Sequence, residues 1–361
     1  MGTVDTRAPA RVNFRFAGAL GIALAVITVV IANHDHLPIR DPDDNIWPAY
    51  IRLPAMMLAA FALDILPRAA WRSRGRWREF GAVARHAVVE RWPLSQVWFA
   101  LTGVATWYLS YAAFRDLKSY VPFVNQEIWD PTFARIDKTL WLGHSPAQVL
   151  HTVFGTGFMA QVFSCIYVAW IVMIPVSIAI ALIWTRNRRA GQWFVTALAV
   201  DWALGVGAYF AFPTLGPIYS DHRTFAGLDH TYVTTLQDKL LSDRIAVLAN
   251  PWHTDAVQTI AAFPSLHVGM MVTVMLCLEL FSVRRWMRIA GRIGLLLTIL
   301  ATVYLGWHFF TDALGGIVVG SLGVWIAALG TGNHIGLRPV LRRDEVSAPV
   351  DQEIAEPSRL A

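Results

Sequence analysis

Long apolar stretches recur along this chain of 361 residues, and each has the length of a helix that crosses a membrane. Stretches of about 17 to 20 mostly apolar residues match the roughly 20 residues that a helix needs to cross the hydrocarbon core. Hydrophobic residues make up 55% of the chain and charged residues only 15%, which disfavours a pair of soluble domains. We therefore predict an all-α fold, a polytopic transmembrane helical bundle. Its eight predicted spans are residues 16–32, 47–66, 96–114, 164–184, 192–212, 265–281, 292–308 and 312–330.

The basic residues are distributed unevenly between the two sides that these eight spans define. Of the 30 Lys and Arg residues, 21 fall in segments predicted to lie on one side. Because cytoplasmic loops carry an excess of Lys and Arg, we predict that both termini are cytoplasmic. The net charge of +5 follows from this topology and not from a basic soluble surface, so we predict no nucleic-acid partner.

The segments between the spans differ in character. Residues 115–150 mix basic side chains, Trp and Pro, as an interfacial segment on the outer leaflet would. Residues 213–262 form the longest outside loop, and loops of this length are often functional. The acidic loop 33–46 is interpreted as a solvated turn in preference to a metal site. Cys165 and Cys277 fall inside spans, where a disulfide or a metal site is not expected.

Two short polar motifs interrupt the apolar C-terminal third. The first is Pro-Ser-Leu-His at 264–267, and the second pairs His308 with Asp312, four residues later. Residues 293–330 are almost continuously apolar, and as one helix they would extend about 57 Å, well beyond a core of ~30 Å. We therefore predict a break near His308, at the same membrane surface where the span beginning near His267 enters. Ionisable residues in this setting indicate a functional site.

Each residue type in the two motifs has a chemical use. A neutral His308 can attack phosphorus, while the Asp312 carboxylate fixes its tautomer and stabilises the cation that forms. His267 can protonate a leaving oxygen as general acid. Ser265 can cap the sixth span or donate to a phosphate oxygen. Structural alternatives remain open for each residue, because a histidine near a helix end often packs at the interface and Asp312 can serve as an N-cap.

The motifs 262–267 (Ala-Phe-Pro-Ser-Leu-His) and 308–316 (His-Phe-Phe-Thr-Asp-Ala-Leu-Gly-Gly) resemble the second and third motifs of the type 2 phosphatidic acid phosphatase superfamily. Within it, the chain looks most like the branch containing inositol phosphorylceramide synthase, with sphingomyelin synthase as a more distant relative. Residues 115–122, Asp137-Lys138 and 143–146 resemble the segment that precedes the core helices of that branch. The resemblance covers roughly residues 100–330.

The resemblance implies a metal-independent enzyme without a cofactor, which acts through a phosphohistidine. By carry-over, His308 is the nucleophile, Asp312 its orienting partner and His267 the general acid, with Ser265 near the phosphate. The resemblance also implies a six-helix phosphatase-like catalytic core, residues 96–332. From the predicted spans, the arginine distribution and the composition, we predict two transmembrane helices and a basic cytoplasmic loop in residues 1–95 and a disordered cytoplasmic tail in residues 333–361.

The chain also departs from the phosphatase pattern. It lacks the Lys and Arg-Pro pair of the first motif, and Ala301-Thr302 stands where phosphatases have Ser-Arg. The cations that bind phosphate must come from elsewhere, and Arg115, Lys118 and Arg223 are the candidates. This departure favours the transferase branch over a plain phosphatase.

The function predicted from the sequence is that of an integral membrane lipid phosphotransferase in the cell membrane with its active site on the extracytoplasmic side. Its expected substrate is a membrane phospholipid or polyprenyl phosphate, and its acceptor is inositol or another alcohol. The alternative is a lipid phosphate phosphatase acting on phosphatidic acid, phosphatidylglycerol phosphate or polyprenyl pyrophosphate. An alternative of another class is a non-enzymatic transporter or scaffold, in which Asp64 and Asp201 would be functional. The oligomeric state is left open.

Overall fold

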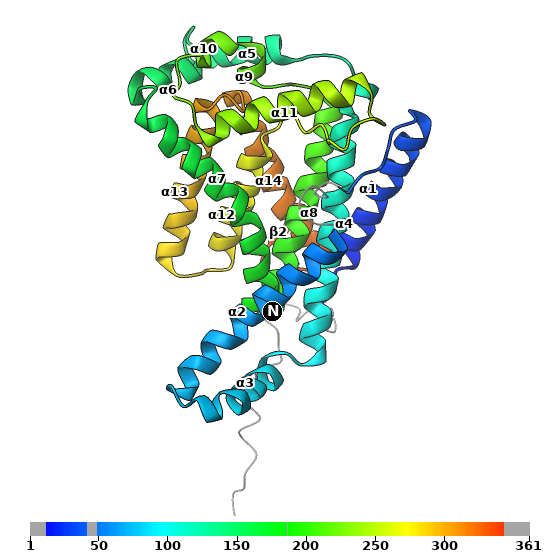
Figure 1. Cartoon of the computed structure of the whole chain (residues 1–361), viewed down its shortest axis with the longest axis vertical. Helices are drawn as coiled ribbons and strands as arrows, with labels where there is room; N and C mark the ends of the chain where they lie inside the picture. The colour runs from blue at the N-terminus through cyan, green and yellow to red at the C-terminus, as the bar shows by residue number, and fades with distance from the viewer. Residues whose placement is uncertain (1–11, 42–48, 186, 343–361) are drawn as a thin grey trace, which may run out of the picture.

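The computed structural model describes residues 12–41, 49–185 and 187–342, and helices dominate it (Figure 1). The prediction of an all-α bundle is confirmed. The elements are α1 (Arg15–His34), α2 (Ala49–Ser73), α3 (Trp77–Arg91), α4 (Leu94–Val124), α5 (Asp130–Leu140), α6 (Pro146–Phe154), α7 (Phe158–Ala179), the π-helical turn η1 (Ile180–Trp184), α8 (Arg188–Ala211), α9 (Pro217–Ser220), α10 (His222–Phe225), α11 (Tyr232–Ala249), α12 (Leu266–Leu280), α13 (Arg285–Tyr304), α14 (Phe310–Thr331), β1 (His334–Ile335) and β2 (Arg338–Pro339).

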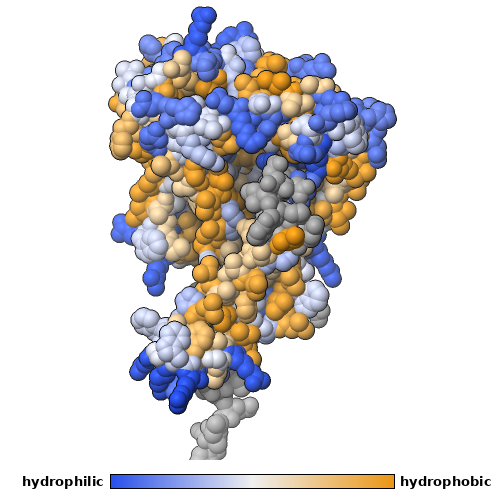
Figure 2. Space-filling view, in the orientation of Figure 1, coloured by the Kyte–Doolittle hydropathy of each residue, from blue (hydrophilic) through white to orange (hydrophobic). Residues whose placement is uncertain are grey.

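Within the described residues, seven helices are long and apolar enough to cross a membrane. They are α1, the Leu53–Ser73 part of α2, α4, α7 continued by η1, α8, α13 and α14. The sixth predicted span corresponds to α12, which is apolar but only 15 residues long. Apolar side chains are exposed along the bundle, and Leu58 on α2 is 67% exposed. Figure 2 shows this apolar surface over the middle of the bundle and along α2, as expected for a multi-pass membrane protein.

The core of the bundle forms around α8, which contacts α4, α12 and α14. Trp193 on α8 is fully buried, and its Nε1 donates a 2.8 Å hydrogen bond to the carbonyl oxygen of Val324 on α14. Asp201, one of the buried carboxylates in the spans, accepts a 2.6 Å hydrogen bond from Oγ1 of Thr273 on α12. These contacts hold α12 and α14, which carry the two polar motifs, against one central helix.

A cap of helices covers one end of the bundle (Figure 1). It consists of α5, α6, α9, α10 and α11, and the arginine-rich pair α2 and α3 lies at the opposite end. The long predicted loop 213–262 supplies three of these helices. Gln237 of α11 donates a 2.8 Å hydrogen bond to the carbonyl oxygen of Leu305, so the cap is tied directly to the turn between α13 and α14.

One predicted span boundary was wrong, and two predicted segments contain further elements. The third span was predicted to end at 114, but α4 continues to Val124 because Leu117, Tyr120 and Val121 are buried against the bundle. Arg115 and Lys118 therefore lie within a helix and not in a segment outside it. The predicted basic loop before residue 95 contains the end of α2 and all of α3. In the predicted disordered tail, residues 334–339 pair as a short hairpin, whereas 343–361 lie outside the described residues, as do 42–46 of the acidic loop.

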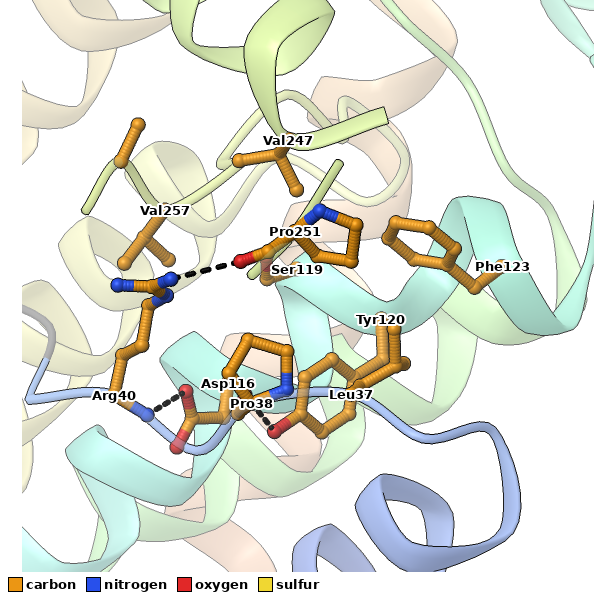
Figure 3. A pocket seen from close by; sticks show the side chains of 11 residues that line it. Leu37, Pro38, Arg40, Asp116, Ser119, Tyr120, Phe123, Val247, Pro251 and Val257 are labelled. Atoms are coloured by element: carbon orange, nitrogen blue, oxygen red, sulfur yellow. Dashed lines mark hydrogen bonds between the residues drawn. The ribbon is translucent and has the colours of Figure 1, made fainter. Parts of the chain in front are cut away.

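The segment after α1, residues 37–40, packs between α4 and the loop that follows α11 (Figure 3). The backbone amide of Arg40 donates to Asp116 at 3.2 Å, and its guanidinium donates to the carbonyl oxygen of Pro251 at 2.7 Å. Tyr120 donates its hydroxyl to the carbonyl oxygen of Pro38 at 2.8 Å. The cavity among these residues is about 10 Å³, which is room for a single water at most. The contacts therefore brace α4 and do not form a ligand site.

Candidate active site

The two polar motifs meet at the capped end of the bundle because both lie where helices begin. Ser265 is the N-cap of α12, and its hydroxyl accepts a hydrogen bond from the backbone amide of Val268 at 3.4 Å. The predicted break in the C-terminal apolar stretch lies between Tyr304 and Phe310, where the chain turns from α13 into α14. Gly306 has a φ of +76° in this turn, a backbone conformation that residues other than glycine rarely adopt.

His308 lies between a carboxylate and a second imidazole. Its Nε2 is 3.1 Å from Nδ1 of His267, and its Nδ1 is 3.4 Å from Oδ2 of Asp312. Asp312 is 0% exposed, and the same Oδ2 accepts a hydrogen bond from the backbone amide of Phe309 at 2.9 Å. Its Oδ1 has no hydrogen-bond partner in the described part of the chain, so it can accept the Nδ1 proton of His308 after a small rotation. The structure therefore brings together the three residues that the sequence predicted to be catalytic.

The turn that carries His308 is buried, and this determines the charge state of the imidazole. Burial, with a smaller contribution from the positive charge of Lys118, lowers the pKa of His308 from 6.5 to about 3. The imidazole is therefore neutral at physiological pH, and one of its nitrogens carries a lone pair. A neutral imidazole beside a carboxylate is the form that can attack an electrophile.

Close helix packing sets the distance between the two histidines. A Cβ placed on Gly316 of α14 would overlap the carbonyl oxygen of Ser265, and one on Gly320 would overlap that of Gly269. Small residues four apart let two helices approach until their backbones touch. Larger side chains at these positions would separate α12 from α14 and therefore separate His267 from His308.

Asp137, on α5, holds the start of α14 from the side of the cap. Its carboxylate accepts hydrogen bonds from the backbone amides of Phe310 and Thr311, at 2.7 and 2.8 Å, and from the Thr311 hydroxyl at 2.6 Å. Asp130 acts in the same way on the amides of Leu215 and Gly216, both at 2.8 Å. Sequence reasoning assigned neither residue a structural role. The available signal was a pair of acidic residues, seven positions apart, in an amphipathic segment.

An aromatic wall lies against His267. The ring centroids of Tyr167 and Trp170 are 4.9 and 4.3 Å from that of the imidazole, and Trp307 stacks on Tyr167 at 5.2 Å. Sequence reasoning missed this wall as well, although Tyr167 and Trp170 are three residues apart and therefore share a helix face. The wall limits the freedom of His267 and keeps water away from the imidazole.

The three candidate cations occupy different environments. Lys118 is half-buried, its Nζ is 4.8 Å from the ring centroid of Tyr209, and its charge acts on both His267 and His308. Arg115 lies one turn away on α4 and interacts with Asp116 and Lys118. Arg223 is exposed on α10, and no contact links it to either histidine. Lys118 is therefore the candidate cation that the fold brings to the histidines.

A cavity of about 270 Å³ opens in front of His308, between α5 and the α9–α10 segment. Its charged lining consists of the carboxylates Asp130, Asp137 and Asp221 and the single cation Lys138. Oxygen atoms that accept hydrogen bonds therefore dominate its polar surface, and a hydroxyl-rich molecule can donate to them. Among the residues that the structure describes, no three His, Cys, Asp or Glu side chains form a group that could hold a metal ion.

The chain matches the model of a known protein family. The family model of the PAP2 superfamily matches residues 131–326, a range that includes His267, His308 and Asp312. No curated protein matches the chain. No solved structure matches it either.

Proposed function

The chain belongs to the PAP2 superfamily, and we propose that it is an integral membrane lipid phosphotransferase that works through a phosphohistidine on His308. In this proposal a phosphoryl-containing group passes from a membrane phospholipid or polyprenyl phosphate to an alcohol acceptor such as inositol. The observation that carries it is the position of His308, with Nε2 3.1 Å from His267 and Nδ1 3.4 Å from Asp312.

In the first half-reaction the phosphate enters between the two imidazoles, which are in direct contact in its absence. Nε2 of His308 forms a bond to phosphorus while the bond from phosphorus to the lipid oxygen breaks. His267 gives a proton to that oxygen, and Asp312 accepts a hydrogen bond from Nδ1 of the resulting cationic ring. Lys118 offsets the negative charge on the phosphate oxygens. The role of Ser265 in phosphate binding rests on its position at the start of α12, because its hydroxyl already accepts the amide of Val268.

In the second half-reaction the acceptor oxygen attacks phosphorus, its proton passes to His267, and the bond to Nε2 breaks. The acceptor fits the cavity in front of His308. The Asp130, Asp137 and Asp221 carboxylates in its wall favour hydroxyl groups and disfavour a second anion. This support for an alcohol acceptor is the reason to prefer the transferase over the phosphatase, in which water takes the same place.

The proposed site is on the extracytoplasmic face of the cell membrane, and both termini are cytoplasmic. Support comes from the arginine-rich pair α2 and α3, which lies at the end of the bundle opposite the cap (Figure 1). A lipid head group in the outer leaflet would then reach His308 beneath the cap.

Turnover of radiolabelled lipids by the purified full chain tests the proposal. We expect a new phosphorylated product only when inositol, glycerol or another alcohol is added to a phospholipid or polyprenyl phosphate. Release of free phosphate at the same rate without any alcohol would contradict the transferase and favour the phosphatase. No turnover of any lipid, with protein that remains folded, would contradict both and favour the transporter or scaffold alternative, in which Asp201 is the group to examine.

A further inference from the structure

Arg244 lines a second cavity, separate from the one in front of His308. This cavity has a volume of about 260 Å³ and lies beneath α11, over the ends of α4 and α8. Its polar lining includes Asn125 and Thr214 in addition to Arg244, and its apolar lining includes Ile128, Leu248 and Ile260. It is therefore large enough to hold a small ligand, and its lining contains one cation.

The Arg244 guanidinium has no hydrogen bond or ion pair with any residue that the structure describes, although the side chain is half-buried. Nearby carboxylates are engaged elsewhere: Asp243 pairs with Lys239 at 2.9 Å, and Asp130 accepts two backbone amides. Glu127, which also lines the cavity, accepts a hydrogen bond from Nε1 of Trp129 at 3.1 Å. Burial lowers the pKa of Arg244, and the charge of Asp130 only partly opposes this effect. A half-buried guanidinium without a partner is a site that an anion would stabilise.

The rim of the cavity is apolar and faces outward. Ile128, between α4 and α5, is 57% exposed, and Leu248, near the end of α11, is 42% exposed. Exposed aliphatic side chains beside a half-buried cation match a ligand with an anionic group and an apolar body.

We propose that this cavity binds the phosphate group of an anionic lipid, with Arg244 holding the phosphate and the rim contacting the glycerol and acyl region. Arginine is suited to this task because its planar fork donates two parallel hydrogen bonds to phosphate oxygens. The site goes beyond the proposed reaction, which uses Lys118 and the histidines.

A narrow wall separates this site from the histidines. The carbonyl oxygen of Thr214 accepts the amide of Ala262 at 3.0 Å, and its hydroxyl accepts the amide of Phe263 at 2.7 Å. Ile260 and Ala261 line the Arg244 cavity, and the segment that contains them continues into the motif that carries His267. A lipid bound at Arg244 therefore contacts the segment that positions the general acid.

Binding stoichiometry tests the inference without turnover. The full chain in detergent, carrying His308→Ala in every variant, is dialysed to equilibrium against radiolabelled dihexanoyl phosphatidate. We expect one equivalent of probe that depends on Arg244, whether or not a further equivalent binds beside residue 308. Arg244→Gln should lose one equivalent, and Arg135→Gln should lose none, because Arg135 is an exposed cap arginine outside this cavity. Leu248→Asp, at an exposed rim position, should also lose one equivalent because it adds a negative charge beside Arg244.

The outcomes separate the alternatives. Displacement of the Arg244-dependent equivalent by inorganic phosphate would show that the phosphate alone is recognised, whereas displacement only by lipids would show that the glycerol and acyl region is required as well. Unchanged stoichiometry in both Arg244→Gln and Leu248→Asp would overturn the inference. Binding is measured without catalysis, so the result does not depend on whether His308 is the nucleophile.

Discussion

The backbone amide of Ser265 donates a 2.9 Å hydrogen bond to the backbone carbonyl oxygen of Asp312. This bond joins the N-cap of α12 to the first turn of α14, so two motifs more than forty residues apart share one main-chain contact. Because the backbones are tied here, the side chains of His267 and His308 are held at 3.1 Å by the fold and not by their own attraction. A phosphate that enters between them meets a preorganised site.

We expect His308→Ala to lower kcat/KM for lipid turnover by at least about 10³-fold, because no other group can take up the phosphoryl group. Asp312→Asn should lower it by roughly 10²- to 10⁴-fold, since the amide can favour the wrong tautomer of His308. Radiolabelled lipid turnover by purified protein measures both effects. His222→Ala is the control, because His222 is exposed on the cap. Full activity in His308→Ala would rule out the mechanism.

Lys118→Gln should reduce kcat/KM by about 10²-fold or more, because it removes the cation whose charge acts on both histidines. The loss should be greater for a phosphate monoester, which carries more negative charge, than for a diester of the same lipid. Steady-state kinetics on the two substrates measure this difference. An equal loss on both substrates, or no loss, would mean that Lys118 acts only through packing against Tyr209.

Activity should be unaffected by EDTA or another chelator, because the proposed chemistry uses two imidazoles and a carboxylate without a metal ion. The measurement is lipid turnover after dialysis against chelator and again after addition of Mg²⁺, Ca²⁺ or Zn²⁺. A loss on dialysis that any of these ions reverses would contradict the proposal and direct attention to Asp130, Asp137 and Asp221, which line the cavity in front of His308.

The fold was largely predictable because lipid permits few solutions. Long apolar stretches had to become helices, and the length of residues 293–330 required the break that the structure places before Phe310. The three proposed catalytic residues were predictable for a related reason. Ionisable histidine and aspartate side chains at the ends of membrane helices are costly, so they indicate a functional site. The end of α4 was not predictable from hydropathy, because Arg115 and Lys118 look like the start of a loop.

The supporting residues could not be predicted, since their partners are far away in the sequence. Asp137 lies 173 and 174 positions from the residues whose backbone amides donate to it. The sequence around Asp137 therefore gives no sign that it is a partner of α14. The same is true of Arg244, which the sequence presents as one more charge in the long loop 213–262. The sequence also offered Arg115, Lys118 and Arg223 as candidates. The path of α4 brings Lys118 to the histidines, whereas Arg223 is exposed on α10.

Stability should fall with acid partly through His308. The pKa of His308 is about 3 in the folded protein, whereas an unperturbed histidine has a pKa of 6.5. The unfolded chain therefore takes up a proton first as the pH falls. The contribution of His308 to the free energy of unfolding is therefore fully present above pH 6.5. It is lost progressively as the pH falls toward about 3, by up to about 1.4 kcal/mol per pH unit. His308→Asn removes this dependence. Thermal unfolding in detergent between pH 7 and about pH 5 should show a flatter decline for the variant, and parallel declines would contradict the assignment.

The packing of α12 against α14 gives the last prediction. Gly320→Ala should destabilise the protein by about 1 to 3 kcal/mol and lower turnover, because the new methyl group would overlap the carbonyl oxygen of Gly269 and force the two helices apart. Gly207→Ala on α8 is the matched control, since a Cβ at Gly207 meets nothing within 4 Å. Thermal unfolding and lipid turnover of the two variants should therefore differ. If Gly320→Ala matched Gly207→Ala in both measurements, close backbone contact between α12 and α14 would not be what sets the distance between His267 and His308.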